Sequence, residues 1–481
     1  MNIIFSCQSA SLNFMIPMAA EFRKINPQAN IIFFISDYRF FKNFLKSNDL
    51  EEDVSGFKFI FLKDIFTSLD SSEFLAESEY RDIVDIDQYN FRDILDSDRR
   101  IKYGKLSQFD KIYSRQISDL QKERLLRRIS YALKSSLPFS GRTIGISFAC
   151  NIITDLFLSL LKLENYEFFN IRSARFQNYV FIEQQINDPS AEFQRDFDRI
   201  LNTVCDSELD QYITQIESRY EGVQSGDVQK SNGSLLGKLR SFLVRLRPVD
   251  SHCEISSIIQ VGIAFRKRMR RLFSTHSVFF ANSVPSKYFV FPLHAEPEVS
   301  LDVYSRFSLS QAELAIRFAA SLPLGVTLVC KEHPWMVGRR NREFYSCLDR
   351  ISNIALVPSN FELEALVSQA EGVVSYCGST GWLALKHRKP LFLFGESYFS
   401  VLNNNMVWKN RDLRFLNELN VLEFVTSYRY CPASVVALFK TIEARGLKIN
   451  LYSDLLNRSG ALSYRSSDIS SQIDQLARAI L

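Results

Sequence analysis

The sequence predicts an α/β protein with two parallel, doubly wound sheets. Continuous apolar runs, such as residues 31–36 and 142–148, have the composition of strands that are buried on both faces. In two parts of the chain these runs alternate with amphipathic helical segments, an order typical of parallel sheets. A polar, helical stretch at residues 189–275 separates the two parts. Because the chain has 481 residues, two domains are the natural expectation.

The first part opens as strand, helix and strand. We expect strands at 3–6 and 31–36, with a helix at 12–24 between them, and a third strand at 57–62. A basic helical stretch at 111–135 comes before further strand and helix segments at 142–148, 151–163 and 166–171.

The second part repeats this design. Strands are expected at 278–281, 288–292, 326–330, 372–376 and 391–394, and helices close the chain. The predicted organisation is a first domain at 1–185, a helical insertion at 186–276, a second domain at 277–455 and a C-terminal helix at 456–481. A cleft is expected between the two domains.

Composition excludes several classes of protein. The formal net charge of +4 is too small to indicate nucleic-acid binding by itself. Eight scattered cysteines without a CxxC pair favour reduced thiols in a cytosolic protein over a disulfide framework or a zinc site. We expect no signal peptide, since residues 2–6 read as a strand, and no transmembrane helix.

A short turn in the second part is suited to an anion. Gly378, Ser379, Thr380 and Gly381 lie between an apolar strand and a helix that Ser379 or Thr380 can cap. The backbone N–H groups and the helix dipole would favour a phosphate, and the glycines would let it approach closely. A capped turn without a ligand is the alternative.

Lys331 and His333 follow another strand of the same part. Ligands of open α/β sheets bind at the carboxyl edge of the strands, and both side chains can donate to phosphate oxygens. The alternative is that His333 is an ordinary surface histidine.

Three further candidates follow the strand at 288–292. His294, Glu296 and Glu298 would border the cleft, where a carboxylate could act as a base or stabilise positive charge in a transition state. Alternatively, the glutamates are solvated or pair with Arg306 or with an arginine of the other domain.

Glu396 ends the strand at 391–394 and could accept hydrogen bonds from ribose hydroxyls. The alternative is that it caps the next helix or faces water. No Asp-x-Asp pair stands at a suitable strand end, so we expect no metal site. Asp196 and Asp198 fall instead in the predicted insertion.

Two basic stretches, at 238–247 and 266–271, predict a helix that contacts an anionic membrane. A solvated helix face is the alternative. The first domain carries no comparably clear motif, and the sequence does not choose among the polar residues near its strand ends, which are Ser6, Gln8, Ser9, Asp37, Asp155 and Arg175.

Taken together, these segments resemble a known family. FPLHAEPEVS, VCKEHPWMVGRRNREFY and VVSYCGSTGWLALKHRKPLFLFG, within residues 285–400, are similar to the bacterial capsule and surface polysaccharide biosynthesis family. The phrase IRSARFQNYVFI at 171–182 also looks like the N-terminal half of that family. The family looks like GT-B glycosyltransferases and includes retaining Kdo transferases of capsule assembly.

The resemblance implies a GT-B glycosyltransferase that builds a bacterial surface glycan without a resident cofactor. His333 and the Ser379-Thr380 turn would bind the donor nucleotide and its phosphate, and Glu296 and Glu298 would line the cleft. A CMP-linked ulosonic acid such as Kdo is the first choice of donor, and a nucleoside diphosphate sugar is the second. The acceptor would be a glycan or a lipid-linked glycan, at the cytoplasmic face of the inner membrane.

Two other classes of function stay open from the sequence. One is a non-catalytic assembly protein at the membrane that keeps a degenerate nucleotide site. The other is a sugar-nucleotide epimerase with a related fold.

Overall fold

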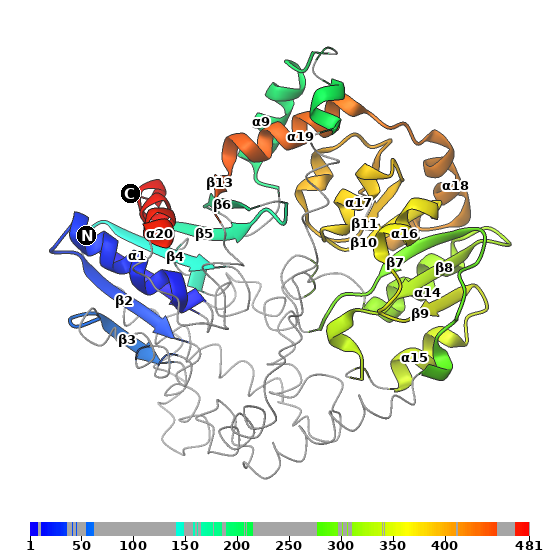
Figure 1. Cartoon of the computed structure of the whole chain (residues 1–481), viewed down its shortest axis with the longest axis horizontal. Helices are drawn as coiled ribbons and strands as arrows, with labels where there is room; N and C mark the ends of the chain where they lie inside the picture. The colour runs from blue at the N-terminus through cyan, green and yellow to red at the C-terminus, as the bar shows by residue number, and fades with distance from the viewer. Residues whose placement is uncertain are drawn as a thin grey trace, which may run out of the picture.

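The computed structural model shows two α/β units, each built around its own sheet (Figure 1). It describes residues 1–7, 11–35, 54–61, 141–148, 165–176, 178–184, 189–205, 209–214, 277–296, 310–338, 342–409, 412–449 and 467–480, together with the short pieces 41, 45, 157–158, 161, 207, 301, 305 and 340. The structural statements below concern these residues.

The first unit has a seven-stranded sheet of order β13-β6-β5-β4-β1-β2-β3. Five of its strands run parallel, as expected for buried strands that are joined by crossover connections. They are β1 (Asn2–Cys7), β2 (Asn30–Ile35), β3 (Lys58–Phe61), β4 (Thr143–Phe148) and β5 (Glu167–Ser173). Two antiparallel strands, β6 (Tyr179–Glu183) and β13 (Leu447–Lys448), complete one edge.

The second unit has a six-stranded sheet of order β12-β11-β10-β7-β8-β9, and every pair in it is parallel. Its strands are β7 (Tyr288–Pro292), β8 (Thr327–Lys331), β9 (Ile354–Val357), β10 (Gly372–Ser375), β11 (Leu391–Leu393) and β12 (Val407–Trp408). Helices of this unit are α14 (Gln311–Ala320), α15 (Arg342–Asp349), α16 (Leu363–Gln369), α17 (Thr380–Lys386) and α18 (Glu418–Ser427). The capping box of Ser310 and Glu313 starts α14.

The end of the chain returns to the first unit. Helix α19 (Pro432–Arg445) lies beside α9 (Ala191–Leu201), and the chain then adds β13 to the first sheet (Figure 1). Helix α20 (Ser467–Ile480) packs near α1 (Leu12–Ile25) and places Ile473 and Leu476 in the core of the first unit. The chain has therefore left the second sheet before residue 455, the end predicted for the second domain. The domain limits stay predictions.

The loop after β5 joins the two units. Phe176 is fully buried, its ring stacks on Trp382 of α17 at 4.0 Å, and it meets Phe439 of α19 edge-on at 5.5 Å. The hydroxyl of Tyr398 accepts from Trp382 Nε1 at 2.8 Å and donates to the carbonyl of Ala174 at 2.6 Å. The two units therefore share a continuous apolar core around this loop.

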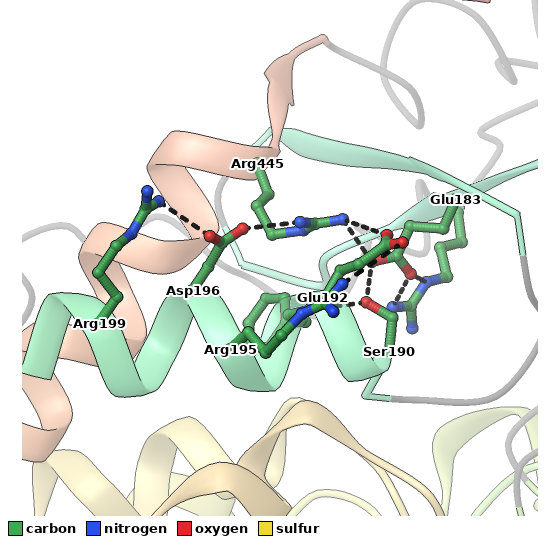
Figure 2. Close-up of polar contacts among 9 residues, drawn as sticks. Glu183, Ser190, Glu192, Arg195, Asp196, Arg199 and Arg445 are labelled. Atoms are coloured by element: carbon green, nitrogen blue, oxygen red, sulfur yellow. Dashed lines mark hydrogen bonds and ion pairs between the residues drawn. The ribbon is translucent and has the colours of Figure 1, made fainter.

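A polar network flanks the same junction (Figure 2). On α19, Arg445 contacts Asp196 of α9 at 2.7 Å and Glu192 at 3.3 Å. The buried carboxylate of Glu183, on β6, accepts from Ser190 at 3.2 Å and from two nitrogens of Arg172, on β5. We call these residues, Arg172, Glu183, Ser190, Glu192, Asp196 and Arg445, the junction network.

The predicted fold class, an α/β protein with two Rossmann-like units, is confirmed by the strand orders of the two sheets. The strand predicted at 278–281 is wrong: residues Ser277–Phe279 form a 3₁₀ turn (η3), and Ala281 makes one backbone bond to Leu356 of β9. Aromatic contacts decide this, since Phe279 and Phe280 both pack on Tyr345. The helices expected at 111–135, 238–247 and 266–271 lie outside the described residues, as do most of the predicted insertion and of the helix at 151–163.

Candidate functional site

The predicted site residues of the second unit follow neighbouring strands at one edge of the sheet. Because β7, β8, β10 and β11 are parallel, the segments after them emerge at the same carboxyl edge. His294 and Glu296 follow β7, His333 follows β8, Gly378 follows β10 and Glu396 follows β11. Glu298 lies outside the described residues.

A buried ion cluster lies where the chain leaves β7 and β8. Arg340 is fully buried and contacts two buried carboxylates, Glu332 at 3.0 Å and Glu296 at 3.2 Å. Tyr345 donates its hydroxyl hydrogen to Glu332 at 2.5 Å, and burial, followed by the charge of Glu332, raises the pKa of Tyr345 well above its usual range. We call Arg340, Glu296, Glu332 and Tyr345 the sealed cluster.

The alternative that Glu296 is solvated is wrong, because its side chain is buried and accepts from Arg340 of the same unit, 44 positions along the chain. Arg306, the other partner considered, lies outside the described residues. A buried carboxylate that is paired with a guanidinium is held in place. Glu296 therefore fits a positioning role better than that of a mobile base.

The sealed cluster and Gln311 hold the backbone of His294. The N–H of His294 donates to Gln311 Oε1 at 2.6 Å, and its carbonyl accepts from Arg340 Nη2 at 2.5 Å and from Gln311 Nε2 at 3.3 Å. Its ring meets Tyr376 edge-on at 5.9 Å. A Cβ on Gly378 would lie 3.3 Å from His294 Cε1, so the structure brings His294 against the predicted anion turn.

Lys331 and His333 have different surroundings. Lys331 is buried, its Nζ donates to the carbonyl of Ser359 at 3.0 Å, and burial lowers its pKa. The ring of His333 is half-buried, and its Nδ1 accepts from the backbone N–H of Trp335 at 3.1 Å. The neutral ring therefore carries its proton on Nε2, the nitrogen that can donate to a ligand. His333 is the better placed phosphate donor of the two.

The turn at 378–381 begins α17, but not through a side-chain cap. Ser379 occupies the N-cap position with an αR backbone and makes no side-chain capping bond, while Thr380 is buried in the first turn. The backbone N–H of Gly381 donates to the carbonyl of Gly378 at 3.2 Å. Since α17 has only seven residues, backbone geometry matters more here than a helix dipole.

The two glycines of the turn have different roles. A Cβ on Gly381 would lie 2.4 Å from the ring of Phe399, so this glycine allows close packing inside the unit. A Cβ on Gly378 would lie 3.3 Å from His294 Cε1 and 3.7 Å from Ser375 Oγ. The expectation that the glycines let a ligand approach closely stays a prediction.

A pocket joins this turn to the first unit. Its walls are Arg172 and Ser173 at the end of β5, Arg175 after that strand, and from the second unit Cys377, Gly378, Glu396, Ser397, Tyr398 and Phe399. Glu396 is half-buried in this wall, and the neighbouring 3₁₀ turn is capped by Ser397, so the capping alternative for Glu396 is wrong. Of the predicted residues of the second unit, only Gly378 and Glu396 line the pocket.

The sequence did not predict the pocket wall that the first unit supplies. Arg175 is one of six polar residues among which the sequence does not choose, and no pattern singled out Arg172 or Ser173. Two arginines directly after a strand, in the phrase IRSAR, were an available signal. The sequence could not say which element of the second unit they would meet.

Two hydroxyls at this edge are buried without a hydrogen-bond partner, Ser375 Oγ at the end of β10 and Ser305 Oγ. An idealised Cβ on Gly378 would lie 3.7 Å from Ser375 Oγ, and one on Gly395 would lie 2.2 Å from Ser305 Oγ. Buried hydroxyls are seldom left unsatisfied in native proteins.

Among the described residues, no group of three His, Cys, Asp or Glu side chains is placed to hold a metal ion. Asp196, on α9, pairs with Arg445 and Arg199, and Asp198 accepts from Gln194. In the described part of the chain, no helix is long and apolar enough to cross a membrane.

The segment that carries the sealed cluster and the turn matches a known family. Residues 245–403 match the family described as capsule polysaccharide biosynthesis protein. The resemblance that the motifs predicted is thereby confirmed, and all the described candidates of the second unit fall inside this capsule segment. No curated protein matches the chain.

Solved structures give distant matches. The β-Kdo 2,7 transferase of KpsC from Thermosulfurimonas dismutans is 14% identical, over 68% of this chain and 90% of that one, with a TM-score of 0.31. The β-Kdo 2,4 transferase of the same KpsC is 10% identical, over 62% and 86%, with a TM-score of 0.31. UDP-GlcNAc 2-epimerase from Neisseria meningitidis is 10% identical, over 92% and 99%, with a TM-score of 0.24. Likenesses this distant carry no argument about activity.

Proposed function

We propose that the protein is a GT-B glycosyltransferase of capsule or related surface polysaccharide synthesis. The observation that carries the proposal is the pocket at the carboxyl edge of the second sheet, walled on its other side by the end of β5 in the first unit. A transferase must hold donor and acceptor together, and a pocket shared by two units meets that need. The match of the capsule segment supports the same pathway.

The donor would bind the second unit. Nε2–H of His333 and the backbone of the turn at 378–381 would hold the nucleotide phosphates, and Glu396 would accept from hydroxyl groups. Arg340 and Gln311 would fix His294 against the turn, which makes its ring the best placed group to contact the reacting sugar. Glu296 would act through Arg340 as a positioning residue.

The donor we favour is a CMP-linked ulosonic acid such as Kdo, with a nucleoside diphosphate sugar second. Calorimetric titration of the full chain with CMP, UDP and GDP separates these donors. We expect CMP to bind most tightly and His333→Ala to weaken it about tenfold or more, since one hydrogen bond to a charged group is lost. If no nucleotide binds and His333→Ala changes nothing, the transferase proposal is wrong.

We also propose that transfer needs no metal ion, with protein donors stabilising the leaving phosphate. Donor turnover in excess EDTA should equal turnover without it. A complete loss of turnover in EDTA that Mn²⁺ or Mg²⁺ restores would contradict the proposal that transfer needs no metal ion. Product analysis without acceptor would reveal an epimerase.

The site of action that we propose is the cytoplasmic face of the inner membrane, reached through the basic residues 238–271. These residues lie outside the described part of the chain, so the support is their composition alone. Flotation with anionic and neutral liposomes tests it, and equal recovery in both would refute it.

A further inference from the structure

Arg175 is held in place by buried residues on both of its sides. Ala174 and Phe176 are fully buried in the core shared by the two units. The carbonyl of Ala174 accepts from Tyr398, and the Phe176 ring stacks on Trp382. The backbone of Arg175 therefore belongs to the first unit, but its position is set by the second.

This anchoring maintains an unusual backbone conformation. Arg175 has a φ of 52°, in the left-handed region that residues other than glycine rarely adopt. Its N–H donates to Ser173 Oγ at 3.0 Å. Its Nη1 reaches across the junction and donates to the carbonyl of Cys377 at 2.5 Å. The guanidinium thus lies directly beside Gly378.

The surroundings of the guanidinium suit a ligand that carries an oxyanion. Arg175 and Arg172 both line the pocket, and Arg172 is already bound to Glu183. Close to Gly378 lies the hydroxyl of Ser375, which is buried without a hydrogen-bond partner. The guanidinium presents five N–H donors in a planar fork that matches a phosphate or a carboxylate.

We propose that Arg175 is a binding residue for an oxyanion of the donor, supplied by the first unit to the Gly378 turn of the second. The proposal rests on the proposed function, in which a nucleotide-linked sugar occupies this edge. The oxyanion is either the phosphate of the nucleotide or the carboxylate of an acidic sugar. Donor binding would then need the two units in the arrangement that the Phe176 anchor fixes.

The test measures binding of three probes to the full chain by calorimetry: CMP, inorganic phosphate and a free 3-deoxy-2-keto sugar acid. Arg175→Gln keeps an amide donor for the Cys377 carbonyl but removes the charge, and Arg175→Lys keeps the charge but not the fork. Arg199→Gln is the matched control, because Arg199 is an exposed arginine that pairs with Asp196 on α9. Thermal unfolding of each variant reports on structure.

We expect Arg175→Gln to weaken binding of the oxyanion probe about 10- to 100-fold. The unfolding midpoint of this variant should stay close to that of the wild type. Arg175→Lys should lose less affinity for the probe than Arg175→Gln, and Arg199→Gln should bind the probe as the wild type does. Weakening of CMP and phosphate identifies the phosphate as the ligand group, and weakening of the sugar acid alone identifies the carboxylate.

The failures of the two proposals are distinguishable. If the wild type binds CMP and Arg175→Gln binds all the probes as the wild type does, this inference is overturned and the transferase proposal stands. If the wild type binds phosphate through Arg175 but no nucleotide, the inference stands and the transferase proposal fails. Wild-type protein that binds none of these probes, and neither UDP nor GDP, overturns both.

Discussion

The sealed cluster and the junction network both bury arginine against carboxylates, but they occupy different places in the molecule. The sealed cluster lies within the second unit, where Arg340 serves two carboxylates and has no exposed surface. The junction network connects β5, β6, α9 and α19, and it runs from the buried Glu183 to the largely exposed Glu192 (Figure 2).

The difference teaches what each set of charges can do. Buried ion pairs add little net stability over apolar side chains, but they become costly when one partner is removed. The sealed cluster fixes the backbone of His294 beside the turn. The junction network holds Arg172 in the pocket wall while it ties the returning helix α19 to α9, so it couples the pocket to the arrangement of the two units.

Arg340→Met should have the largest effect. It leaves Glu296 and Glu332 buried without a cation, and removing one partner of such a set costs about 3–5 kcal/mol of unfolding free energy. Urea unfolding measures it. Arg350→Met, at an exposed position after α15, is the control and should change stability by less than about 0.5 kcal/mol. A loss below about 1 kcal/mol for Arg340→Met would show that the cluster is not sealed.

Arg172→Met should cost less, about 2–3 kcal/mol by the same measurement, because Glu183 keeps Ser190 at 3.2 Å and Arg445 at 3.9 Å. The double variant Arg172→Met, Arg445→Met tests whether the junction residues act together. It should lose more unfolding free energy than the sum of the two single variants. Strict additivity would mean that the junction residues act independently.

The smallest effect concerns a partly exposed group, Glu364 with Lys386 and His387, that belongs to neither cluster. A hydrogen bond with Lys386, at 2.7 Å, and a second one with His387 lower the pKa of Glu364, whose side chain is 38% exposed. A carboxylate with a lowered pKa in the folded state contributes stability above its ordinary pKa, and loses it as pH falls through the lowered value. Glu364→Gln should therefore cost about 0.5 kcal/mol of unfolding free energy at pH 7, and progressively less as the pH falls toward 3.

Urea unfolding of both proteins across this pH range measures the effect of Glu364→Gln. Glu371→Gln, at an exposed position before β10, is the control. A cost that persists undiminished at pH 3 would show that the carboxylate charge is not responsible.

The amino-acid sequence by itself determined the two α/β units and the edge at which the candidates lie. Continuous apolar runs identify buried parallel strands, and parallel strands place the residues after them at one edge. His333, Gly378 and Glu396 could therefore be assigned to this edge from the sequence alone, since their positions follow from local pattern and strand direction.

Only the tertiary structure decided the partners. Glu296 pairs with Arg340, which is 44 positions away, and Arg175 meets Cys377, which is 202 positions away. Such contacts depend on how helices and loops pack across the sheet and between the units, and no local periodicity encodes them. The same reason explains why the first-unit wall of the pocket could not be predicted: strand ends are visible in a sequence, but the surface that a strand end faces is set by long-range packing.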